Sequence, residues 1–134
     1  PSLAERNGPY DQYHHGDINA LHVSYYRLKH PDELAFLLCN LRKSYGFHMV
    51  AQGAGPIPPV AQAIPPYRVA VTKAGPRFEL HIGQGEHPDL CVLRWTDDGE
   101  RYGAVLGDGK IGFRQMTPMI AEYANLKVTR VVEA

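Results

Sequence analysis

The clearest hydrophobic pattern in the chain lies in residues 31–45, PDELAFLLCNLRKSY. Its apolar side chains recur at the i, i+3, i+4 spacing that forms one face of an amphipathic helix; they are Leu34, Leu37, Leu38, Leu41 and Tyr45. Pro31 suits the first helical position because its missing N–H needs no partner there. Gly46 suits the end of a helix because glycine accepts a left-handed conformation. The pattern therefore predicts one main helix over residues 31–45.

Alternating apolar and polar residues predict short β-strands on both sides of this helix. The predicted strands span residues 21–25, 47–51, 67–72, 77–82, 90–95, 101–106, 110–115 and 126–132. Asp98 and Gly99 favour a tight hairpin between residues 90–95 and 101–106, because both accept positive φ. Thr117 and Pro118 favour the start of a second short helix that ends at residue 124.

These elements predict an α+β fold within a single domain, residues 1–134. An antiparallel sheet of about six to eight short strands carries the main helix on one face, and the second helix lies near the C-terminus. Residues 1–19 are interrupted by glycine and proline and are expected to form an irregular arm. Residues 53–66, GAGPIPPVAQAIPP, carry no charge and are expected to form a long proline-rich loop.

Charge and composition narrow the class of partner. Fourteen Lys and Arg balance fourteen Asp and Glu, so no net charge draws the molecule to nucleic acid or to an anionic membrane. The apolar runs are too short to cross a bilayer. A soluble, cytoplasmic protein is expected. Cys39 and Cys91 both have apolar neighbours in the sequence, which predicts that both are small buried side chains. Phe78, Phe113 and one face of Trp95 are expected in the core.

The histidines supply the main candidate chemistry. His81, Glu86 and His87, with Asp89 nearby, combine two imidazoles with a carboxylate, a ligand set that suits a divalent transition metal. The competing interpretation is a solvated turn, because the spacing matches no known zinc motif. The chain has no nucleophile elbow, no phosphate-binding loop and no zinc-deaminase signature. No catalytic residues and no cofactor are therefore expected. The missing motifs favour a protein that is not an enzyme and leave that question open.

Exposed aromatic and apolar residues predict a surface for binding another protein, because they cost little to desolvate and are enriched at interfaces. The candidates lie in or beside the proline-rich loop and after the first strand; they are Tyr26, Ile57, Val60, Ile64 and Tyr67.

From residue 19 to residue 113, the order of elements resembles a bacterial immunity-protein family that neutralises deaminase-type polymorphic toxins. The resemblance rests on HPDELAFLLCNL for the helix and RFELHIGQGEHPDLCVLRWTDDGERYGAVLGDG for the meander. It implies a small protein-binding module that covers the active site of a toxin. Two alternatives remain open: a small metal-dependent enzyme that uses the histidine and glutamate cluster, and a homo-oligomeric accessory domain.

Overall fold

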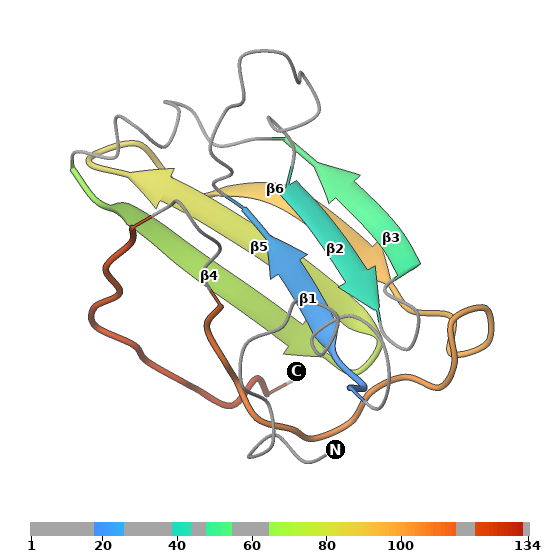
Figure 1. The fold of residues 1–134 in the computed structure, drawn as a ribbon. Coiled ribbons are helices and arrows are strands. Elements are labelled where there is room, and N and C mark those ends of the chain that lie inside the picture. The colour runs from blue at the N-terminus through green and yellow to red at the C-terminus, as the bar shows by residue number, and fades with distance from the viewer. Residues whose placement is uncertain (1–17, 26–38, 44–47, 55–64, 115–119, 133–134) are drawn as a thin grey trace.

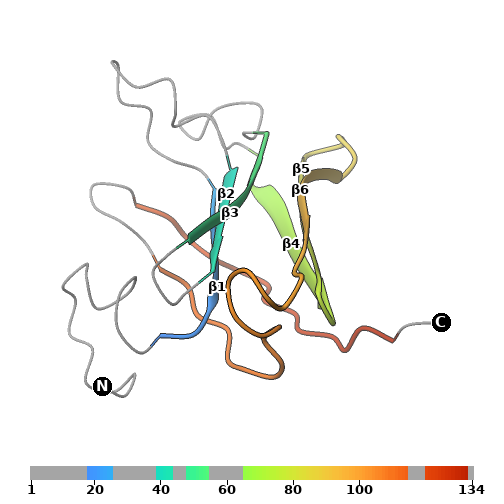
Figure 2. The same ribbon diagram turned by 90° about the vertical axis from the view of Figure 1, so that its right-hand side faces the viewer.

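The computed structural model describes residues 18–25, 39–43, 48–54, 65–114 and 120–132. Within these ranges, six strands form two three-stranded antiparallel sheets (Figure 1). The first sheet contains β1 (Leu21–Ser24), β2 (Cys39–Lys43) and β3 (His48–Gly53), in that order. The second contains β4 (Tyr67–Ala74), β5 (Arg77–Gln84) and β6 (Leu90–Thr96). Figure 2 shows the two sheets as separate layers.

The hydrophobic core lies between the two layers. Alternation along the strands turns every second side chain inward. The buried apolar residues are Cys39 and Leu41 from β2, Phe78, Leu80 and Ile82 from β5, and Leu93 from β6. Trp95 packs against this cluster and is partly buried. The centre of each sheet thus supplies most of the core.

The two sheets approach each other most closely where β3 ends beside β6. The backbone N–H of Ala54 donates a hydrogen bond to the carbonyl of Val92, with an N···O distance of 3.1 Å. A Cβ atom on Gly53 would lie 1.8 Å from that same carbonyl oxygen. Glycine is therefore required at residue 53, because any side chain would push the two backbones apart.

A buried ion pair links the first sheet to the chain that follows β6. The Lys43 ammonium group lies 2.6 Å from a carboxylate oxygen of Asp97. It also donates hydrogen bonds to the carbonyls of Gly103, at 2.7 Å, and Ala104, at 2.8 Å. All three ammonium protons thus have an acceptor, as a buried charge requires.

The predicted α+β class is wrong, because the described part of the chain is all-β and contains no helix. Residues 39–43, the last third of the predicted main helix, form the central strand of the first sheet. Leu41 fits a period of two with Cys39 as well as the helical period, and pairing with strands on both sides favours the extended form. Leu34, Leu37 and Leu38 lie outside the described residues. Of the predicted second helix, residues 120–124 are irregular and residues 117–119 lie outside the described ranges.

Five predicted strands are confirmed as β1, β3, β4, β5 and β6. The predicted hairpin after β6 is wrong, because residues 101–106 form turns and irregular chain. Asp97 is held by Lys43, and the carbonyls of Gly103 and Ala104 face the same ammonium group instead of pairing with β6. The predicted strands at 110–115 and 126–132 are also absent from the described residues, which are irregular there.

Two predictions about burial differ from the structure, and one is confirmed. Cys39 is buried as predicted, whereas Cys91 is exposed, because the irregularity in the β5–β6 register places it opposite His81 and away from the core. Phe113, expected in the core, is exposed. Neither Cys39 nor Cys91 forms a disulfide bond. None of the described segments forms a helix long and apolar enough to cross a membrane.

Candidate functional site

The face of the β4–β5–β6 sheet that points away from the core, here called the outer face, gathers the candidate functional groups. Its members follow from the strand register: Arg68, Ala70 and Thr72 on β4, Glu79, His81 and Gly83 on β5, and Cys91, Arg94 and Thr96 on β6. Sheet pairing holds the backbone of every one of them, with one irregularity in the β5–β6 register next to His81. Polar groups placed on paired strands are fixed more firmly than groups on loops.

A chain of charged and polar groups crosses the outer face from β6 to β5. The Arg94 side chain donates a hydrogen bond from Nε to Glu79 Oε1, with a distance of 2.7 Å. The second carboxylate oxygen, Glu79 Oε2, lies 3.6 Å from His81 Nε2. Arg94 is 69% exposed, whereas Glu79 and His81 are each 29% exposed. The carboxylate is therefore oriented by one partner and still reached by solvent.

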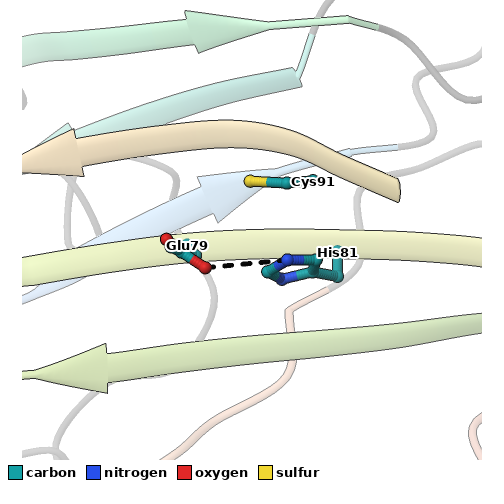
Figure 3. Close-up of side chains that lie close together, drawn as sticks. All are labelled: Glu79, His81 and Cys91. Atoms are coloured by element: carbon teal, nitrogen blue, oxygen red, sulfur yellow. Dashed lines mark ion pairs between the residues drawn. The ribbon is translucent and has the colours of Figure 1, made fainter. Parts of the chain in front are cut away.

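Cys91 completes a group of three side chains whose types can bind a metal ion. It pairs with His81 across the two strands, and Glu79 lies two residues before His81 on the same face. One ligand atom from each residue lies within 4.8 Å of the other two. Figure 3 shows the three side chains close together on neighbouring strands. The Cys91 thiol also makes a weak hydrogen bond to the Leu93 carbonyl at 3.5 Å. A sulfur, a nitrogen and an oxygen atom that could bind a metal thus lie close together on the outer face.

A second ion pair occupies the far end of the outer face. Arg68 contacts Asp89 Oδ1 through Nη2 at 2.9 Å. Its guanidinium group also donates hydrogen bonds to the backbone carbonyls of Gly85 and His87, each at 2.7 Å. A Cβ atom at Gly83 would lie 1.9 Å from Asp89 Oδ1, so glycine at residue 83 leaves the space through which this pair crosses β5. Arg68 therefore fixes the β5–β6 turn to β4.

The structure separates the predicted metal set. His81 lies on the outer face, as alternation indicates, but Glu86 and His87 lie in the exposed turn between β5 and β6. The ligand group found around His81 contains Glu79 and Cys91 instead. Glu79 was recognisable in the sequence from its i, i+2 relation to His81. Cys91 was not, because its place depends on an irregularity in the β5–β6 register next to His81.

Only one of the residues predicted to bind another protein lies in the described ranges. Tyr67 begins β4 and packs partly against the core. Burial raises the pKa of its hydroxyl above the ordinary value of 10.0. Tyr26, Ile57, Val60 and Ile64 lie outside the described residues, as does most of the proline-rich loop.

Comparison with known proteins gives a family and an architecture. A family described as a domain of unknown function, DUF1961, matches residues 1–128. The uncharacterised protein YesU of Bacillus subtilis (strain 168) is 50% identical over 132 residues, which is 98% of this chain and 58% of that protein. The chain thus spans little more than half of that relative.

A crystal structure of a protein of unknown function from Bacillus subtilis, described as having a galectin-like fold, is also similar. The two chains are 48% identical, with a TM-score of 0.65 over 79% of this chain and 46% of the other. This likeness supports the all-β architecture and again excludes the predicted α+β class. With residues 1–128 matched by one family and half of the aligned residues shared with YesU, the chain belongs to the DUF1961 family.

Proposed function

We propose that the outer face of the β4–β5–β6 sheet binds a carbohydrate. The observation that carries the proposal is the oriented chain of Arg94, Glu79 and His81 across two paired strands. Sugar hydroxyls both donate and accept hydrogen bonds, so they match a surface that offers guanidinium donors beside carboxylate acceptors. The rigid sheet lowers the entropy lost on binding, because these groups are ordered before the ligand arrives.

The shape of this surface is compatible with a flat, polar ligand. Ala70 lies opposite His81 on β4, and Gly83 lies two residues further along β5. The register places Ala70 and His81 between the Arg94–Glu79 pair and the Arg68–Asp89 pair, which crosses β5 over Gly83. A sugar ring placed over His81 would therefore meet charged hydrogen-bonding groups on both sides.

The fold adds support by analogy. The similar solved structure is described as galectin-like, and lectin domains are common among two-sheet β-sandwich proteins. Because one fold hosts many functions, this likeness favours carbohydrate binding without naming a sugar.

Glycan binding by purified protein tests the proposal. The chain is screened against an array of neutral and acidic oligosaccharides, and the positive glycans are titrated by calorimetry in chelator. Arg94→Ala and Glu79→Gln each remove a charge-assisted hydrogen bond, so each should weaken binding by about 10-fold or more. Lys110→Ala changes an exposed charge outside both sheets and should leave affinity unchanged. Absence of saturable binding to every glycan, or equal affinity in all variants, would refute the proposal.

The hypotheses based on a protein partner stay predictions. They comprise the immunity-protein resemblance, toxin neutralisation and homo-oligomer formation, and their candidate residues are described only at Tyr67. A cytoplasmic location also stays a prediction.

A further inference from the structure

We propose that Glu79, His81 and Cys91 form a zinc-binding site on the outer face. A carboxylate, an imidazole and a thiolate are each established zinc ligands. The zinc site shares Glu79 and His81 with the proposed carbohydrate surface, but the proposal rests on the geometry of the three ligands and does not require that a sugar binds.

The backbone places all three ligands on one face. Glu79 and His81 are two positions apart on β5, so alternation points both side chains outward. Cys91 is the register partner of His81 on β6. Directly opposed residues in an antiparallel pair have Cβ atoms about 4.5–5.5 Å apart. The three side chains therefore converge because of sheet pairing, without help from a loop.

The distances are close to those that zinc requires. Tetrahedral zinc, with bonds of about 2.0–2.3 Å, holds its ligand atoms about 3.3–3.6 Å from one another. Glu79 Oε2 and His81 Nε2 are already 3.6 Å apart. No ligand atom in the group is more than 4.8 Å from another, so closing the site requires shifts of no more than about 1.5 Å, within the range of side-chain rotation.

Arg94 orients the carboxylate for this purpose. Its Nε binds Glu79 Oε1, which leaves Oε2 on the side of His81 (Figure 3). Hydrogen bonding of one carboxylate oxygen while the other binds metal is the usual arrangement around protein metal ligands. The guanidinium group is a positioning residue here and supplies no ligand.

The charges balance when the thiol loses its proton. On zinc binding, the Cys91 S–H bond breaks, its proton passes to solvent, and the sulfur forms a bond to the metal. The thiolate and the Glu79 carboxylate then offset the two positive charges of the ion. Because Cys91 is exposed, water can reach the fourth tetrahedral position, as in zinc sites that are open to a ligand.

The test uses zinc and cobalt(II) on reduced, chelator-treated protein. Calorimetry should show saturable one-to-one zinc uptake with proton release. Cobalt should give a thiolate-to-metal charge-transfer band in the near ultraviolet, because the thiolate is a ligand. Cys91→Ala should abolish that band, since the remaining thiol, Cys39, is buried. His81→Ala and Cys91→Ala should each weaken zinc binding on the order of 100-fold, given that loss of even an outer-shell partner costs about 10–100-fold.

His87→Ala is the matched control, because it removes an exposed imidazole from the neighbouring turn and leaves the backbone carbonyl that binds Arg68. Its zinc affinity should equal that of the wild type. Three results would overturn the proposal: no saturable uptake, uptake without a thiolate band, or a loss in His87→Ala as large as that in His81→Ala. Glycan titration of Cys91→Ala in chelator separates the two proposals, because it removes a metal ligand and keeps the Arg94–Glu79 pair.

Discussion

Replacing Lys43 with methionine should destabilise the fold by about 3–5 kcal/mol, the usual cost of removing one partner of a buried ion pair. The Lys43 and Asp97 side chains are 1% and 4% exposed. Methionine keeps most of the apolar stem, so the change removes the ammonium group with little change in packing volume. The measured loss should therefore report the buried charge.

The size of the effect follows from what the substitution leaves behind. The Lys43 ammonium group has three oxygen acceptors: the Asp97 carboxylate and the carbonyls of Gly103 and Ala104. After the change, Asp97 keeps the backbone N–H of Gly99 as a hydrogen-bond donor to its other oxygen. A buried carboxylate with one neutral donor is poorly compensated. A loss of this size is a large fraction of the roughly 5–15 kcal/mol that stabilises a typical domain.

Urea unfolding followed by Trp95 fluorescence measures the loss. The double variant Lys43→Met/Asp97→Asn should be less destabilised than the sum of the two single variants, because the neutral amide tolerates the site better than an unpaired charge. A loss below about 1 kcal/mol for Lys43→Met, the range of exposed pairs, would show that water solvates the ammonium group. Additive single variants would contradict the pairing of the two charges.

Two further predictions concern the joint between the sheets and the turn after β6. Gly53→Ala should lower the free energy of unfolding in urea by about 1–3 kcal/mol or more, because its Cβ would meet the Val92 carbonyl. Gly107→Ala is the control and should be near neutral, because the space around Gly107 is open. Equal losses in the two variants would contradict the close approach of the two backbones at Gly53. Hydrogen bonds from two backbone N–H groups hold the pKa of the Asp98 carboxyl below its ordinary value of 3.8. The lowered pKa contributes a small stabilisation of the folded state that is present above pH 3.8 and is lost as pH falls through the lowered pKa. An NMR titration of the Asp98 carboxyl with a midpoint at or above 3.8 would contradict these hydrogen bonds in the turn.

Most of the strands could be predicted from the sequence, but the helix could not be excluded. Leu41 satisfies a helical period with Leu37 and Leu38, and it also satisfies a period of two with Cys39. The sequence alone does not say that strands lie on both sides of residues 39–43, and this pairing determines the outcome. The hairpin after β6 failed for a similar reason. The chain does turn at Gly99, which has a φ of 73°. Lys43, which is distant in the sequence, then binds the carbonyls of Gly103 and Ala104, so the chain after the turn does not pair with β6.

Local sequence patterns predict two residues of the candidate site, whereas the third depends on how distant strands pair. Alternation alone placed His81 on the outer face, and the same rule applied to Glu79 gives the second ligand. Cys91 lies beside Glu79 and His81 because the β5–β6 register shifts between Leu80 and His81. Without that irregularity the partner of His81 would be Val92, since Leu93 pairs with Leu80. The apolar neighbours of Cys91 in the sequence therefore predicted a buried thiol, whereas the sheet exposes it.

Glu79 connects the two proposals for the outer face. Its Oε1 accepts a hydrogen bond from Arg94, and its Oε2 faces His81. A zinc ion on Oε2 would withdraw charge from the carboxylate and weaken it as an acceptor for a sugar hydroxyl, while a vacant coordination position would offer the sugar a new partner. Either effect changes sugar affinity, and thermodynamic linkage requires sugar to change zinc affinity by the same factor. Because one carboxylate serves both ligands, zinc and carbohydrate cannot bind to this face independently.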